Sequence, residues 1–389
     1  MNAAEIRRPF DVPLLEDLPD PAGRRVLVRA DLDIPPTEDD DLCHVRHVEQ
    51  LGPTLEWLFQ RGAEVTVSGH QGPLGSTGDP DRFARTAKAL TSHYPKLRVL
   101  PNLAEGERPF SAAHETTDGH RADGADLLDW LLEGQELFVN DDFQWCATPL
   151  VSVVGPPTVL PSAAGRRLQA DLELLAPMLA PERPFVVVIG SRSVLDRLRD
   201  LQALVLRADA VLVGAQMSHP FFVALGKQPP GDEPPDFIEE CRRAYGVAHE
   251  ILHDVVLPLD LVWERDDGTM VVAKPESVIA GSIADIGPRT AVRYAEVLRG
   301  ARRILWMGAL GKLEDARFAE GTLAVARSLS KLSAGVVVGG DALVRALREH
   351  RLLPESAGVV SATGSTIALL KDGDLPGLAA LRRAPRAGW

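Results

Sequence analysis

Short runs of aliphatic residues alternate along this chain with longer stretches in which apolar residues recur every three or four positions. The short runs are typical of buried strands, and the longer stretches are typical of helices. Strands are expected at 26–30, 63–68, 97–100, 136–140, 185–190, 210–214, 303–308 and 334–340. Helices are expected at 48–59, 125–132, 164–179, 194–208, 236–249 and 289–298. This alternation predicts an α/β protein whose parallel sheets are covered on both faces.

Length and charge narrow the class of protein. A chain of 389 residues suggests two or more domains, and the proline-rich stretch at 155–162 is interpreted as a domain junction. A net charge of −13 argues against nucleic-acid or anionic-membrane partners. The sequence has no membrane-length apolar run or signal-peptide core, and Cys43, Cys146 and Cys241 fit no zinc pattern, so we expect a cytoplasmic monomer with reduced thiols.

Four expected strands of the second half end at glycine, namely at Gly190, Gly214, Gly308 and the pair Gly339-Gly340. In a parallel sheet these ends meet at one edge, where a following helix can bind an anion, so we expect a ligand cleft there. Asp341 follows the pair and can cap the next helix or hold Mg²⁺ beside a nucleotide. Such glycines are also common turn residues, and the chain has no GxxxxGK[ST] motif.

Ordered motifs extend this pattern over almost the whole chain. They are VRADLDIP from Val28, GAEVTVSGHQGP from Gly62, FVNDDF from Phe138, RPFVVVIG from Arg183, DIGPRT from Asp285, LWMGALG from Leu305, FAEGT from Phe318, GGD from Gly339 and LPG from Leu375. In this order they resemble the VR-D-N-P, GA…SHLGRP, VNDAF, RPF…LGG, DIGP-T, WNGPMG, FA-GT, GGD and LPG segments of the phosphoglycerate kinase family. Asp33 replaces the asparagine of the first segment.

The resemblance implies two Rossmann-like three-layer domains, with parallel sheets facing a cleft that closes about a hinge. The N-terminal domain, expected at 1–163, would hold an acidic acceptor. The C-terminal domain, expected at 164–365, would hold MgATP, and residues 366–389 would return to the N-terminal domain. The family reaction moves a phosphoryl group between ATP and the carboxylate of 3-phosphoglycerate, and no structural metal is expected.

Most basic residues of that family are absent at the matching positions. These positions hold His47, Gly72 or Pro73, Ala104, Ala147, Thr148, Leu150, Ser193 and Arg197. The resemblance also implies that Met307 replaces an asparagine, that Ala342 replaces a hydroxyl residue, and that Ala-Thr-Gly at 362–364 replaces a triple glycine. Phosphoryl transfer depends on cations that neutralise the transferring group, and one close charge pair is worth about 4 kcal/mol before desolvation at a screened effective dielectric. The sequence therefore predicts that affinity for phosphoglycerate is lost.

The surviving polar residues are the candidates for a site. The catalytic candidates are Asp31, His70 and Arg197, and the substrate-binding candidates are Arg29, Asp33, Gly72, Asp141 and Trp145. The nucleotide-binding candidates are Gly190, Arg197, Gly214, Gly308, Glu314, Gly339, Gly340 and Asp341. Asp341 is also the candidate Mg²⁺ ligand if a nucleotide binds. The structural alternative is that the glycines hold turns, and that Asp31 and His70 are satisfied by buried partners such as Arg29.

Three functions compete at this point. The first is a repurposed enzyme that acts in the interdomain cleft on a small neutral or cationic molecule, with or without MgATP. The second is a pseudoenzyme that kept the scaffold as a binding protein. The third is residual phosphoglycerate kinase activity.

Overall fold

The computed structural model describes residues 9–32, 40–72, 79–103, 125–190, 201–229, 231 and 234–386. The chain divides into two compact units, an N-terminal unit of Met1–Ala176 with Asp374–Trp389 and a C-terminal unit of Pro177–Gly373. The sequence predicts the first domain boundary after residue 163. In the structure the two units divide after Ala176, inside helix α5 (Arg166–Leu179). The C-terminal residues group with the N-terminal unit because helix α13 (Pro376–Arg383) packs against helix α4 (Val151–Val154).

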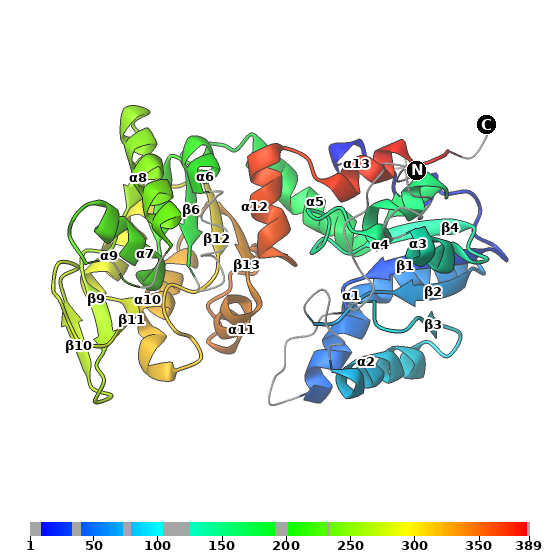
Figure 1. Ribbon diagram of the computed structural model, residues 1–389, viewed down its shortest axis with the longest axis horizontal. Coiled ribbons are helices and arrows are strands. Elements are labelled where there is room, and N and C mark those ends of the chain that lie inside the picture. The colour runs from blue at the N-terminus through cyan, green and yellow to red at the C-terminus, as the bar shows by residue number, and fades with distance from the viewer. Residues whose placement is uncertain are drawn as a thin grey trace, which may run out of the picture. The chain divides into compact units, whose positions relative to one another are not determined.

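The N-terminal unit is built on a five-stranded parallel sheet with the order β3-β2-β1-β4-β5. Its strands are β1 (Arg25–Ala30), β2 (Glu64–Ser68), β3 (Arg98–Val99), β4 (Leu137–Asp141) and β5 (Ser162–Ala164). Its remaining elements are η1 (Pro9–Asp11), η2 (Leu15–Asp17), α1 (Asp40–Gln60), α2 (Pro80–His93), α3 (Ala125–Leu132), η3 (Pro156–Thr158) and the start of α5 (Arg166–Leu179). Figure 1 shows the central strands β1 and β4 side by side.

The C-terminal unit contains a six-stranded parallel sheet with the order β14-β13-β12-β6-β7-β8. Its strands are β6 (Phe185–Ile189), β7 (Ala210–Val213), β8 (Asp254–Val256), β12 (Arg303–Met307), β13 (Gly335–Gly339) and β14 (Gly358–Val360). Its helices are α6 (Leu201–Arg207), α7 (Ala215–Ala224), α8 (Pro235–Glu250), α9 (Pro288–Arg299), η5 (Ala316–Phe318), α10 (Glu320–Leu329), α11 (Asp341–Glu349) and α12 (Thr363–Asp372). The expected α/β class with parallel sheets is confirmed.

A small antiparallel sheet in the C-terminal unit was not expected from the sequence. It has the order β10-β9-β11, with β9 (Leu261–Glu264), β10 (Met270–Ala273) and β11 (Ser282–Ile286). Its strands are short, and β10 has no fully buried residue, so the strong aliphatic signal of a parallel strand is missing. Gly268, with a φ of +79°, allows the tight turn between β9 and β10.

Each unit has its own hydrophobic core. In the N-terminal unit, Val26, Val28 and Val139 of the sheet pack with Leu51 and Leu55 of α1. In the C-terminal unit the largest buried side chains are Trp306 on β12 and Tyr294 on α9. Burial of one large apolar side chain contributes about 1.5–3 kcal/mol, so each core can hold its strand ends firmly in place.

Most expected helices begin and end within two residues of their observed bounds. Helix α1 is longer than expected, because it starts at Asp40 and continues through Pro53, where the sequence suggested an interruption. The expected helix at 194–208 is described only as α6, since 191–200 lie outside the described residues. Among the described helices, none combines the length and apolarity that crossing a membrane requires.

Candidate functional site

Arg29 lies at the end of β1 and is completely buried. Its Nε donates to Ser152 Oγ at 2.9 Å, and its Nη1 donates to the carbonyl oxygen of Ala30 at 2.6 Å. Nη1 also forms an ion pair with Asp142 Oδ2 at 2.8 Å, in which both side chains are fully buried. All three nitrogens of the guanidinium therefore have partners within the unit, and the candidate substrate-binding residue acts here as a structural centre.

His70 follows β2 and completes the partners of Arg29. Its Nδ1 lies 2.9 Å from Arg29 Nη2, and because a guanidinium can only donate, Nδ1 accepts and the ring proton resides on Nε2. Burial and the positive charge of Arg29 lower the pKa of His70 to about 3. The ring packs edge-on against half-buried Trp145 at 4.4 Å between centroids. His70 is thus a neutral hydrogen-bond donor, and its buried Nε2 has no partner in the protein.

Asp31 forms an ion pair with Arg167 of α5, at 3.3 Å between Oδ2 and Nη2. Arg167 is mostly buried, and burial disfavours its charge, but Asp31, Asp171 and other nearby carboxylates raise its pKa overall. The sequence interpretation suggested Arg29 as a buried partner of Asp31, whereas the structure pairs Asp31 with Arg167. The sequence interpretation missed Arg167 because it lies 136 positions from Asp31 along the chain, and no motif links the two residues.

Asp141 at the end of β4 caps helix α5. Its Oδ1 accepts from the backbone N–H groups of Arg167 at 2.9 Å and Leu168 at 3.2 Å. The side chain is fully buried, and this burial raises the pKa of Asp141 despite the hydrogen bonds. The carboxylate that was assigned to substrate binding therefore holds the N-terminus of a helix.

The remaining N-terminal candidates are less constrained. Gly72 is half-buried and has a φ of +92°, which favours glycine. Asp33, and Arg197 of the C-terminal unit, lie outside the described residues. The structure thus brings Arg29, His70 and Trp145 together around Asp142, and it joins Asp31 to Arg167.

The C-terminal unit has an open cavity of about 300 Å³ at the ends of β12 and β13. Four predicted residues line it: Gly308, Glu314, Gly340 and Asp341. Gln216, Lys312 and Thr363 also line it and were missed by the sequence interpretation. Lys312 Nζ donates to Glu264 Oε2 at 3.0 Å and Ser282 Oγ at 2.9 Å, so its charge is partly compensated.

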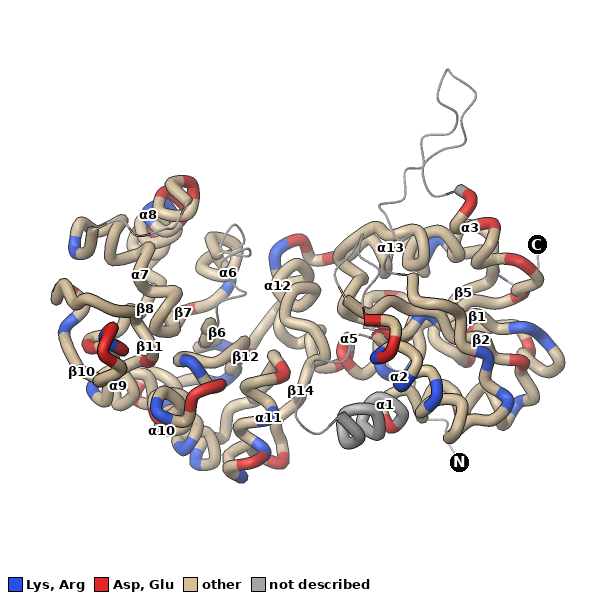
Figure 2. Tube along the Cα trace, turned by 60° about the horizontal axis from the view of Figure 1, so that its bottom comes forward, with Lys and Arg blue, Asp and Glu red and all other residues tan. Residues whose placement is uncertain are grey.

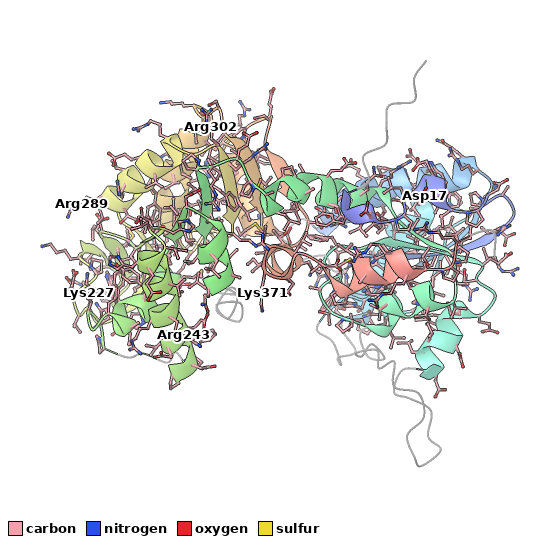
Figure 3. The ribbon with its side chains drawn as sticks, turned by 90° about the horizontal axis from the view of Figure 1, so that it is seen from above. Asp17, Lys227, Arg243, Arg289, Arg302 and Lys371 are labelled. Atoms are coloured by element: carbon pink, nitrogen blue, oxygen red, sulfur yellow. The ribbon has the colours of Figure 1, made fainter. Side chains whose placement is uncertain are left out.

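Two helices begin at this cavity. Helix α11 starts after Gly340, whose φ of +101° is accessible to glycine, and α12 starts at Thr363; neither N-terminus has a side-chain cap. Uncapped N–H groups at a helix start can bind phosphate oxygens. Helix α11 carries both acidic and basic residues (Figure 2). Lys227, Arg243 and Arg289 lie at the outer edge of the unit (Figure 3), and none of them lines the cavity.

Three predicted nucleotide-binding glycines lie outside the lining. Gly190 packs so closely that an added Cβ would lie 1.8 Å from the carbonyl oxygen of Ala309, and a Cβ on Gly214 would lie 2.9 Å from Gly190 Cα. The carbonyl of Gly339 accepts from the N–H of Gly308 at 3.0 Å. These glycines let neighbouring strand ends approach one another, which is the structural alternative the sequence left open.

Asp285 supports the loop beneath the cavity. Its Oδ2 accepts from the N–H of Gly321 at 2.7 Å and its Oδ1 from the N–H of Ile286 at 2.8 Å. A Cβ on Gly311, which lines the cavity, would lie 2.2 Å from Asp285 Oδ1. Burial raises the pKa of Asp285 to about 7. The carboxylate therefore joins the end of β11 to the first turn of α10, and its raised pKa lies near neutral pH.

The cavity residues fit a magnesium–nucleotide. A volume of about 300 Å³ is at the lower end of the range for small-molecule sites. The glycine-lined backbone and two uncapped helix starts suit phosphate groups, and Asp341 supplies a carboxylate of the type that binds Mg²⁺ beside substrate phosphates. Within the described ranges, no group of three or more His, Cys, Asp or Glu side chains forms a protein-only metal site.

These features define a class of protein: an α/β chain of two parallel-sheet units, one of which carries a glycine-lined cavity at its strand ends. The family model described as phosphoglycerate kinase matches residues 15–373, so the chain belongs to the phosphoglycerate kinase family.

Relatives and solved structures agree with this assignment. Proteins named phosphoglycerate kinase from Frankia casuarinae and Thermus thermophilus are 34% and 32% identical, over 92% and 93% of this chain and 97% and 98% of their own. The structures of phosphoglycerate kinase from Coxiella burnetii and Pyrococcus horikoshii OT3 superpose with TM-scores of 0.74 and 0.76. Each is 23% identical, and they cover 96% and 95% of this chain and 100% and 98% of their own.

Proposed function

We propose that this chain is a nucleotide-dependent phosphotransferase of the phosphoglycerate kinase family that acts on an acceptor other than 3-phosphoglycerate. The cavity at the ends of β12 and β13 supports the nucleotide part, since its backbone and helix starts suit phosphates. The proposal of a different acceptor rests on the contacts of Arg29. Its guanidinium forms an ion pair with Asp142 and hydrogen bonds with Ser152, Ala30 and His70.

The roles follow from position. The N-termini of α11 and α12 would hold phosphate oxygens, Asp341 would hold Mg²⁺, and Glu314, the match of the family's ribose-binding glutamate, would hold the sugar. When bound, MgATP would supply the phosphoryl group and a cation that neutralises charge on it. The residues of this chain would orient the nucleotide, because phosphoryl transfer depends mainly on positioning and electrostatics.

Calorimetric titration of the full chain with MgATP tests the nucleotide part. Binding that weakens when Glu314 is replaced by Ala, but not when the exposed Glu355 outside the cavity lining is replaced by Ala, is the expected result. Absence of heat at millimolar nucleotide would contradict the proposal. An ATP-consumption assay over a panel of hydroxy and carboxylic acids then separates a transferase from a pseudoenzyme, which binds nucleotide without turnover.

The relatives favour a second candidate, phosphoglycerate kinase activity itself. Relatives that carry this name match 92–93% of the chain at 31–34% identity. A coupled assay with ATP and 3-phosphoglycerate decides between the candidates directly. Turnover with 3-phosphoglycerate at the rate of an intact relative would establish the second candidate, and turnover near background supports a changed acceptor.

A further inference from the structure

We propose that Asp142 is a built-in counter-ion on the acceptor side, which occupies Arg29 and makes the N-terminal unit select an uncharged or cationic ligand over a phosphorylated acid. This inference rests on the proposed function, because it names the class of acceptor for the same protein. Residue 142 is aspartate in this chain, and the resemblance places it at the alanine of the family segment VNDAF.

Asp142 directly contacts the guanidinium of Arg29. Its carboxylate lies 2.8 Å from Arg29 Nη1, and both side chains are fully buried. Its Oδ1 accepts from the N–H of Trp145 at 3.4 Å, which fixes the loop after β4. A small anion that approached Arg29 at Nη1 would have to displace this carboxylate, because the second Nη1 donor is bound to Ala30, and Nε and Nη2 already contact Ser152 and His70.

Several carboxylates surround the second arginine of this region, Arg167. Asp31, Asp171, Asp142 and Asp141 all act on the guanidinium of Arg167. Among the described residues of this region, two arginines thus face four carboxylates. Arg167 Nη1 has no hydrogen-bond partner, but within the described ranges the carboxylates outnumber the guanidiniums, so a ligand with both a carboxylate and a phosphate would meet excess like charge here.

His70 Nε2 is a hydrogen-bond donor without a partner in the protein. His70 Nε2 is buried, bears the ring proton and has no hydrogen-bond partner, which costs free energy unless an acceptor arrives. Because His70 is neutral, it suits an uncharged hydroxyl or carbonyl oxygen. The half-buried ring of Trp145 beside it offers apolar surface to the carbon part of such a ligand.

The test removes the carboxylate in two ways. Asp142→Ala leaves space for a small anion next to Arg29, and Asp142→Asn keeps the shape but removes the charge. Asp129→Asn, an exposed change of the same charge on α3, is the matched control. Sodium formate, at constant ionic strength against chloride, probes the space in a thermal-unfolding assay, and 3-phosphoglycerate is titrated by calorimetry without nucleotide.

We expect formate to raise the melting temperature of Asp142→Ala but not of the unchanged protein or Asp129→Asn. We expect 3-phosphoglycerate to bind both Asp142 variants at least about tenfold more tightly than the control, because one like charge is removed. If formate neither raises the melting temperature of Asp142→Ala nor restores its folding, Asp142 is not replaceable by an anion and the inference is wrong.

The possible failures can be told apart. Asp142 variants that fold but bind 3-phosphoglycerate no better than Asp129→Asn overturn the inference, while the nucleotide part of the proposed function stands. Tight binding of 3-phosphoglycerate to the unchanged protein overturns the inference together with the changed acceptor. Loss of MgATP binding alone contradicts the nucleotide part and leaves the role of Asp142 intact.

Discussion

The two parallel sheets of this protein differ in the residues that follow the carboxyl ends of their strands. In the N-terminal unit, the ends of β1, β2 and β4 are filled by charged side chains that bind one another, with Arg29 and Asp142 completely buried. In the C-terminal unit, the ends of β12 and β13 open into a cavity whose lining includes Gly308, Gly311 and Gly340. The two units share one architecture, so the difference lies in the side chains that follow the strands.

This contrast locates the divergence of the chain. An open, backbone-lined end keeps the general ability to bind phosphate groups, because it depends on N–H groups that most substitutions leave unchanged. In the closed, charge-paired end, the side chains of Arg29 and Asp142 contact each other. Under the proposed function, the changed acceptor therefore belongs to the N-terminal unit.

The largest expected effect comes from breaking the closed end. Arg29→Met should lower the free energy of unfolding by about 3–5 kcal/mol, since it leaves Asp142 buried without its partner. Arg25→Met on the same strand is the control, because Arg25 is about half exposed and its pair with Glu136 should contribute less than about 1 kcal/mol. Urea unfolding measures both, and equal losses would show that burial of the Arg29 pair carries no special weight.

His70 should make the closed end sensitive to acid. Its pKa is about 3 when folded and near 6.5 when unfolded, so the unfolded state takes up a proton first as the pH falls. Its contribution is present above pH 6.5 and is lost below it, by about 2 kcal/mol on reaching pH 4.5. His70→Gln, which can still accept from Arg29, should remove this part of the pH dependence of unfolding. An unchanged acid profile would mean that His70 is accessible to protons in the folded protein.

Asp285, at the open end, should act with the opposite sign. Its folded pKa of about 7 lies above its unfolded value near 3.8, so it stabilises the fold most below pH 4 and progressively less up to pH 7. Relative to Asp285→Asn, the unchanged protein should lose about 2 kcal/mol between pH 5.5 and pH 8. The variant carries a constant cost, because an amide oxygen can replace only one of the two carboxylate acceptors. Parallel curves for the two proteins would contradict the raised pKa.

The sequence predicted the residues at the open strand ends better than those at the closed strand ends, because different interactions determine the two. Glycines after aliphatic runs predicted the lining at Gly308 and Gly340, because strand ends of a parallel sheet converge whatever the side chains are. The closed end depends on side-chain pairs between distant segments, such as Asp31 with Arg167 and Arg29 with Asp142. Sequence patterns do not encode which of several nearby charges will pair. Asp141 was therefore assigned to a ligand when it caps a helix.

The smallest expected effect tests whether the open end is a binding site. Gly340→Ala places a side chain at a φ of +101°, which should cost about 1–2 kcal/mol of stability. Gly268→Ala at a φ of +79° carries similar strain but lies in the turn between β9 and β10, outside the cavity lining. Both variants should therefore lose similar stability in urea. Only Gly340→Ala should also bind MgATP about tenfold more weakly by calorimetry, a difference of about 1.4 kcal/mol. If both variants bind MgATP as the unchanged protein does, the nucleotide does not contact the turn between β13 and α11, and the cavity is not its binding site.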